Sequence, residues 1–213
     1  MKFAELLRHP GVEEHVALRG RFGFMAFHGG NLEAGTDDVA EAAAAAAGAS
    51  CYLVRQPADL RWHIPSAEVS PSASPALARF LAHVEVAVAV HGYGREGRWT
   101  TLLLGGANRT LAAHVAGHLR TALPDYEVVD DLAAIPAALR GLHPANPVNL
   151  AAGGGAQLEL PPRVRGRGPF WEASPSRAEG RSSPHTEALV TGLAAAARAW
   201  GVDRRPDPGL DRR

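Results

Sequence analysis

Residues 22–36 read FGFMAFHGGNLEAGT, and this stretch decides how the rest of the chain is interpreted. The apolar run that opens it is typical of a buried strand, and it stops at His28. The two glycines that follow allow backbone conformations closed to other residues, so the chain can fold back and direct Glu33 toward His28. Imidazole and carboxylate groups are ordinary ligands of a zinc ion that keeps one position open for water. The stretch therefore predicts a strand ending in two ligands of a metal site.

A second strand with the same ending lies further along the chain. Residues 84–92 read VEVAVAVHG, an apolar run that leads into His91 and a glycine. Because ligand sites of parallel α/β sheets gather at the carboxyl ends of strands, His28, Glu33 and His91 form a candidate zinc-binding set. The residues leave alternatives open: His28 bonded to backbone within a turn, and Glu33 as a solvated charge beside a helix start. A phosphate-binding loop is disfavoured, because the turn lacks both established glycine patterns.

Composition bounds the class of protein. The chain has 213 residues, 46% of them hydrophobic, and we expect one domain over residues 1–202 with residues 203–213 as a flexible tail. Its 22 basic and 22 acidic residues cancel, which argues against nucleic acid or a membrane as a partner. The lone Cys51 excludes an internal disulfide and suits a small core residue. With neither a signal-peptide pattern nor a transmembrane segment, we expect a cytoplasmic protein, although a protein released by cell lysis would look the same.

Strands and helices alternate along the chain. Thr36 or Asp37 is expected to cap the first long helix, which then runs through an alanine-rich segment. The alternation predicts a single-domain α/β fold, an open, mostly parallel or mixed sheet with helices on both faces. The expected strands are 22–27, 50–54, 84–90, 100–104, 126–129 and 156–160, and the expected helices are 38–48, 76–83, 108–123, 135–139 and 184–200.

Glu159 is the candidate general base. It lies in the segment QLEL, where the alternation of a strand puts Gln157 and Glu159 on one face. A hydrolase with a zinc-bound water needs a carboxylate that takes the proton of that water and later donates it to the leaving amine. The alternative is a charge on an edge strand that faces solvent. Gln157, on the same face, is a candidate for contact with substrate.

Arginine placement indicates an acidic substrate. Arg109 follows a strand and opens a helix, next to Asn108, and Arg165 comes shortly after the predicted base. Because guanidinium groups pair with carboxylates in a two-pronged geometry, we expect Arg109, Arg165 and Asn108 to bind substrate, and His63 to reach the site from a loop. Surface arginines that reflect only a composition bias are the alternative. His114 and His118 lie four apart without the glutamate of a zinc-binding helix, so we do not assign them to the metal.

Several segments together resemble the phage-type poly-γ-glutamate hydrolase family. The stretch 27–40, with its His-Gly-Gly turn, glutamate, Gly-Thr pair and alanine-rich helix, is similar to that family. Four later pieces match in family order: residues 63–66 (HIPS), the apolar strand into 91–92 (HG), residues 104–106 (LGG), and Asn149 followed by residues 154–160 (GGAQLEL) and Arg165.

The resemblance implies a fold, a site and an activity. The family is similar to zinc carboxypeptidases in fold, with one zinc ion at the edge of an open α/β sheet. By this resemblance His28, Glu33 and His91 would bind zinc, Glu159 would be the general base, and Arg109 would bind a substrate carboxylate or the oxyanion. The implied reaction is hydrolysis of γ-glutamyl amide bonds in poly-γ-glutamate. A zinc deacylase or carboxypeptidase acting on a small acidic N-acyl amino acid or peptide is the alternative, and a metal-sensing protein without catalysis is a third.

Overall fold

The computed structural model describes residues 2–168 and 182–201. The expected tail at 203–213 and most of the arginine- and proline-rich segment 167–181 lie outside these residues. Among the described residues, no helix combines the length and the apolar character needed to cross a membrane.

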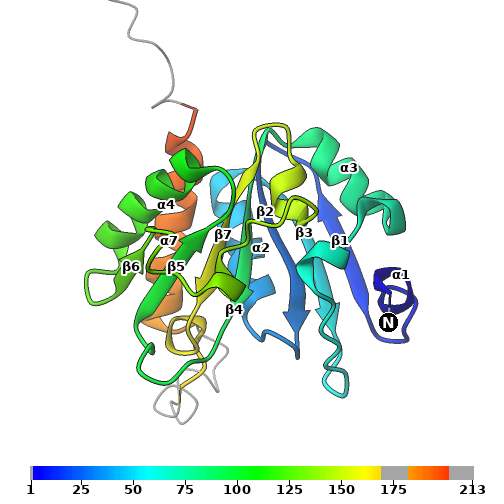
Figure 1. Ribbon diagram of the computed structural model, residues 1–213, viewed down its shortest axis with the longest axis horizontal. Coiled ribbons are helices and arrows are strands. Elements are labelled where there is room, and N and C mark those ends of the chain that lie inside the picture. The colour runs from blue at the N-terminus through cyan, green and yellow to red at the C-terminus, as the bar shows by residue number, and fades with distance from the viewer. Residues whose placement is uncertain (1, 169–181, 202–213) are drawn as a thin grey trace, which may run out of the picture.

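Strands of the described chain form one sheet of mixed direction (Figure 1), in the order β1-β3-β2-β4-β7-β5-β6. The β1–β3 and β5–β7 pairs are antiparallel, whereas β2–β3, β2–β4, β4–β7 and β5–β6 are parallel. The predicted open sheet is therefore confirmed, in its mixed form. The strands are β1 Glu13–Ala17, β2 Phe22–Gly30, β3 Ser50–Gln56, β4 Val86–Gly92, β5 Thr101–Gly105, β6 Glu127–Val129 and β7 Gly155–Leu160.

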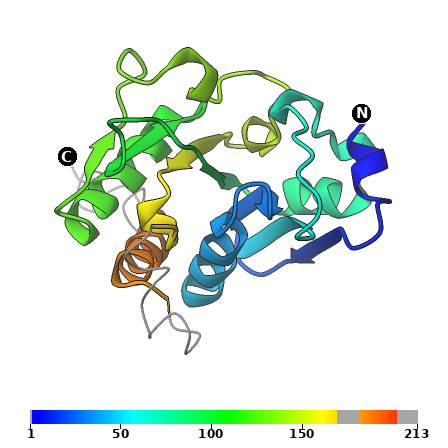
Figure 2. The same cartoon turned by 90° about the horizontal axis from the view of Figure 1, so that it is seen from below.

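Helices cover both faces of the sheet, as the alternation predicts (Figure 2). Alternate residues of β2 supply the two cores: Phe24 packs among residues of α2, α4 and α7, while Met25 packs on the other face with α1 and α3. The helices are α1 Phe3–Leu6, α2 Thr36–Ala47, α3 Pro75–His83, α4 Arg109–Ala122 and α7 Pro184–Ala199. Short 3₁₀ turns are η1 Ser66–Glu68, η2 Pro71–Ala73, η3 Ala137–Leu139, η4 Pro147–Leu150 and η5 Arg163–Arg165.

The structure corrects the predicted helix cap, shortens one helix and adds a strand. The first long helix is capped by Gly35, with φ of 88°, and neither Thr36 nor Asp37 caps it with a side chain. Asp37 instead accepts hydrogen bonds from Gly30 N at 3.0 Å and from Arg55 Nε at 2.8 Å, so it ties α2 to two neighbouring strands. The short helix expected at 135–139 is present as the 3₁₀ helix η3, which begins at Ala137. The edge strand β1 was not expected, because its exposed residues lack the apolar pattern of a buried strand.

Candidate metal centre

A tight turn at the end of β2 brings Glu33 back to His28. The backbone N–H of Glu33 donates to His28 O at 2.9 Å, and Glu33 Oε1 lies 2.9 Å from His28 Nδ1. Gly30 has φ of 67°, and a Cβ atom there would lie 2.2 Å from the carbonyl oxygen of Gln56. Only glycine fits this position, which explains why the turn that returns Glu33 to His28 needs a glycine here.

His91 reaches the same point from the neighbouring strand β4. Its Nδ1 lies 3.3 Å from Glu33 Oε2, and the ring centroids of His28 and His91 are 5.0 Å apart. The backbone N–H of Gly92 also donates to Glu33 Oε2 at 2.9 Å, which holds the carboxylate between the two rings. One ligand atom from each of His28, Glu33 and His91 lies within 4.8 Å of the others. The three predicted ligands are therefore brought together.

The hydrogen bonds of both histidines fit a bound cation. His28 Nε2–H donates to Ile64 O at 2.8 Å, so a neutral His28 ring presents the lone pair of Nδ1 toward Glu33. A lone pair facing a carboxylate is repulsive unless a proton or a cation lies between them. His91 Nε2 is buried without a hydrogen-bond partner among the described residues, so Glu33 is the polar group that engages this ring. Two imidazoles and one carboxylate are a common ligand set for catalytic zinc.

Charges around the site keep Glu33 ionised. Burial by itself raises the pKa of Glu33, but the charge of His91 and the close contacts of the carboxylate with both rings hold the pKa well below its ordinary value. Burial likewise lowers the pKa of His91, and the adjacent Glu33 carboxylate more than reverses that effect. Glu33 is therefore held as a carboxylate between the two rings.

Glu159 lies beside this cluster on a central strand. It pairs in register with His91 on β4 and with Leu103 on β5, and only 4% of its surface is exposed. The alternative of a solvent-facing charge on an edge strand is therefore wrong. Burial raises the pKa of Glu159 to about 7, against the opposing charge of His91. Gln157 Nε2 donates to Glu159 Oε1 at 2.8 Å.

A cavity of about 580 Å³ opens over these residues. His28, Glu33, His91 and Glu159 line it together with residues of two loops, namely His63, Pro65, Ser66 and Ala67 of the first and Ala137, Ala138, Leu139, Gly141, Leu142, His143 and Asn146 of the second. The expected His63 is part of this wall, with its ring centroid 4.9 Å from that of His28. The candidate ligands and the candidate base thus line one open space.

Comparisons with known proteins identify the fold and the family. The family described as poly-gamma-glutamate hydrolase matches residues 2–190. The chain belongs to the poly-gamma-glutamate hydrolase family. Among solved structures, a bacteriophage poly-gamma-glutamate hydrolase superposes with a TM-score of 0.75 at 22% identity, covering 93% of this chain and 95% of that one. A structure described as zinc-free YNDL gives a TM-score of 0.63 at 20% identity, covering 85% and 89%. No curated protein matches the chain.

Membership of the poly-gamma-glutamate hydrolase family confirms the resemblance seen in the sequence. It also confirms the zinc-carboxypeptidase-like α/β fold and identifies the chain as a hydrolytic enzyme acting on amide bonds. Of the alternatives, a protein without catalysis is disfavoured by this membership.

Arg109 and Asn108 lie outside the cavity of this family member. The Arg109 guanidinium donates to the carbonyls of Leu104, at 3.0 Å, and Gly106, at 3.2 Å, and also to Asp130 O. Asn108 caps α4 by accepting from Leu111 N, and its Nδ2 donates to Gly153 O at 2.8 Å. Both side chains hold loops together, so the geometry does not support the expected contact with substrate.

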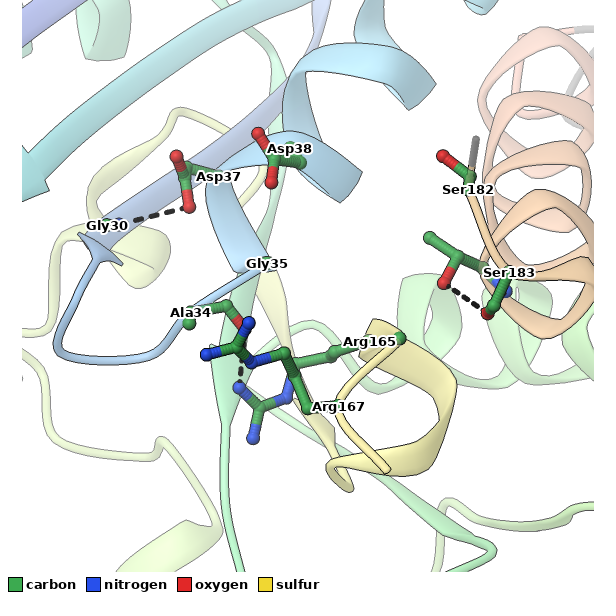
Figure 3. Close-up of a pocket in the computed structure, with 11 residues that line it drawn as sticks. Gly30, Ala34, Gly35, Asp37, Asp38, Arg165, Arg167, Ser182 and Ser183 are labelled. Atoms are coloured by element: carbon green, nitrogen blue, oxygen red, sulfur yellow. Dashed lines mark hydrogen bonds between the residues drawn. The ribbon is translucent and has the colours of Figure 1, made fainter. Parts of the chain in front are cut away.

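Arg165 is not among the residues that line the cavity over the candidate metal centre. Its Nη1 donates to Ala34 O at 2.7 Å and its Nε to Leu160 O at 3.2 Å. Figure 3 shows the guanidinium directed at Ala34 within a separate pocket of about 300 Å³, between the beginnings of α2 and α7. A Cβ atom on Gly92 would lie 2.6 Å from the Arg165 guanidinium carbon, so the arginine packs against the backbone that follows His91. This position supports the turn of Glu33 instead of binding substrate in the cavity.

Two residues of the cavity wall were not expected from the sequence. His143 and Asn146 line the cavity from the loop between β6 and β7. The backbone N–H of Ala145 donates to His143 Nδ1 at 3.1 Å, so a neutral His143 ring carries its proton on Nε2. Both residues occur in an irregular segment, where neither periodicity nor a motif relates them to the distant metal ligands. Only the folding of this loop over β7 could reveal them.

Proposed function

We propose that this chain hydrolyses γ-glutamyl amide bonds of poly-γ-glutamate, with zinc held by His28, Glu33 and His91 and with Glu159 as general base. The observation that carries the proposal is the convergence of the three ligands and the buried base on one cavity. Membership of the poly-gamma-glutamate hydrolase family supports the substrate.

Each side chain has a distinct task in this proposal. Zinc, when bound, lowers the pKa of water toward neutrality and so supplies the nucleophile. Glu159 accepts the proton of that water and returns it to the departing amine. Its pKa of about 7 suits both transfers, because a group that titrates near the working pH can both accept and donate a proton. Gln157 engages Oε1 of the base.

Substrate contacts are assigned to the wall of the cavity. No lysine or arginine is among the described residues that line it, and the amide nitrogens of Asn146 and Gln157 donate within the protein. The rings of His63 and His143 are therefore the side-chain donors of the cavity that we assign to substrate. Burial lowers the pKa of His63, which favours a neutral ring that donates a hydrogen bond rather than a fixed cation. We therefore keep His63 as a substrate contact and add His143, which lines the same cavity.

Elemental analysis and one substitution test the proposal. We expect about one zinc ion per chain, removed by a chelator together with the activity and restored by added zinc. Glu159→Gln should retain zinc and lose at least about a hundredfold in kcat, since general-base catalysis contributes about 10²–10⁴-fold. Activity is followed as the fall in chain length of poly-γ-glutamate, with small N-acyl amino acids as the competing substrates. Full activity of Glu159→Gln would remove the base, and cleavage of the small substrates alone would favour the deacylase alternative.

A further inference from the structure

A chain of buried amide groups leads from the cavity wall to Glu159. Asn146 Nδ2 donates to Gln157 Oε1 at 2.8 Å, and Gln157 Nε2 donates to Glu159 Oε1 at 2.8 Å. The three side chains are between 2% and 4% exposed, so water does not compete for these bonds. Hydrogen bonds of this kind restrict the rotation of the groups they join.

We propose that Asn146 and Gln157 are positioning residues that orient the Glu159 carboxylate for proton transfer, by imposing one direction on this chain of hydrogen bonds. The inference rests on the proposed function, in which Glu159 is the base. Asn146 lies outside all the roles assigned above, and Gln157 acts here on the base instead of on the substrate.

The direction of the chain is set by the backbone. The N–H of Val148 donates to Asn146 Oδ1 at 3.3 Å, which leaves Nδ2 of Asn146 facing Gln157. An amide nitrogen only donates, so the Gln157 atom that meets it must be Oε1, and Nε2 must then face Glu159. If the Gln157 amide were reversed, its oxygen would face the carboxylate and two donors would meet at Asn146. Both contacts would be repulsive.

The surrounding loop holds Gln157 in place. Gly141 has φ of 63°, and a Cβ atom there would lie 2.5 Å from Gln157 Oε1, so the loop packs directly on the amide. Gln157 Nε2 also donates to Leu139 O at 3.4 Å. Asn149 Nδ2 donates to Gly141 O at 2.8 Å and to His143 O at 3.1 Å, which braces the same loop. One oxygen of Glu159 is thereby fixed, and with it the direction of the other.

Asn146→Asp tests the direction of the chain with almost no change in size. The new carboxylate can still accept from Val148 N–H, but it offers Gln157 an acceptor in place of a donor. The Gln157 amide should then reverse and present its oxygen to Glu159. Because burial raises the pKa of a carboxyl, kcat is measured up to pH 9; once the new carboxyl is ionised, we expect kcat on poly-γ-glutamate to fall about 10–100-fold, as for other partners that orient site residues. KM should stay within about twofold and the zinc content should not change.

Asn146→Ala is the matched control. It removes the donor without adding an acceptor, so Gln157 keeps its bonds to Glu159 and Leu139 and kcat should fall less than in Asn146→Asp. A merely structural role predicts instead that the loss of kcat in each variant follows its loss of thermal stability. Gln157→Leu, which removes the donor itself, should reproduce the loss of kcat seen with Asn146→Asp. Equal or reversed effects of the two Asn146 variants, or full kcat in Gln157→Leu, would overturn the inference.

Failure of the inference is distinguishable from failure of the proposed function. If Glu159→Gln is inactive while both Asn146→Asp and Gln157→Leu keep full kcat, Glu159 is the base but does not depend on this chain. If Glu159→Gln is active, the general base itself is wrongly assigned and the inference falls with it. Thermal unfolding of every variant shows whether a loss of kcat reflects a loss of folded protein.

Discussion

Gly30→Ala, compared with Gly48→Ala, measures how strongly the turn at the metal centre depends on the close approach of two strands. Gly30 and Gly48 have nearly the same left-handed backbone, with φ of 67° and 66°. At Gly48 nothing lies within 4 Å of an added Cβ atom. At Gly30 the added atom would lie 2.2 Å from the oxygen and 2.5 Å from the nitrogen of Gln56. The pair therefore separates backbone strain from the contact between strands.

The expected loss follows from these contacts. A left-handed conformation costs a non-glycine residue about 1–2 kcal/mol, and this applies equally to both variants. At Gly30 the end of β2 must also move away from β3 by about 1 Å to restore ordinary contact distances. That movement breaks the hydrogen bond from Asn31 N to Gln56 O, at 3.1 Å, and weakens the one from Gly30 N to Asp37. Each change should lower the free energy of unfolding by about 1 kcal/mol. The free energy of unfolding should fall by about 3–4 kcal/mol for Gly30→Ala and about 1–2 for Gly48→Ala.

Urea unfolding of the metal-free protein measures the two losses, and calorimetric titration measures zinc affinity. With about 2–4 °C of Tm per kcal/mol for a chain of this size, we expect Tm to fall by about 10 °C for Gly30→Ala and about 4 °C for Gly48→Ala. Zinc affinity should fall only for Gly30→Ala, because Glu33 follows the displaced turn. Equal losses of stability, or unchanged zinc affinity in Gly30→Ala, would refute the reasoning.

Two further predictions concern groups away from the cavity. Burial raises the pKa of the Cys51 thiol to about 11, so the folded protein should not react with a thiol reagent at pH 8, whereas urea should expose one reactive thiol per chain. Because the pKa of this thiol is higher in the folded than in the unfolded chain, the free energy of unfolding should be constant below about pH 9 and fall as the pH rises toward 11. Cys51→Ala should lessen that fall. Reaction of the native thiol at pH 8 would contradict the prediction. Arg109→Ala removes a charged donor from three carbonyls and should lower the free energy of unfolding by about 2–3 kcal/mol with KM unchanged, whereas a large rise in KM without loss of stability would restore its expected role with substrate.

Local patterns predicted the parts of the molecule whose causes are local. Strand β2 has alternate residues in two cores, and such runs of apolar residues are recognisable because both faces are buried. The turn from His28 to Glu33 spans few residues and depends on glycine, so it too could be predicted from the sequence. The ends of these strands were harder to predict from the sequence. Strand β2 continues to Gly30 and β4 to Gly92, because glycines can still pair with a neighbouring strand.

The reach of long polar side chains was not predictable in this way. Arg109 opens a helix at the expected edge, yet its guanidinium donates to the backbone carbonyl of Asp130, in the loop after β6. Arg165 likewise turns to Ala34, a residue 131 positions earlier in the chain. A guanidinium binds whichever acceptors the fold brings near it, and backbone carbonyls at loop ends compete with any substrate. Spacing along the chain says nothing about those acceptors.

The sequence by itself determined the candidate site groups and the family of this protein: two histidines and a glutamate at strand ends, a carboxylate in a later strand, and the motifs of the poly-gamma-glutamate hydrolase family. The tertiary structure decided how these groups are placed and buried. Strand β7 lies between β4 and the reversed β5, which buries Glu159 beside His91 rather than leaving it at an edge. It also brings Asn146 onto Gln157. The physical reason is that ligand types and tight turns follow from neighbouring residues, whereas strand order and burial depend on contacts between residues distant in the chain.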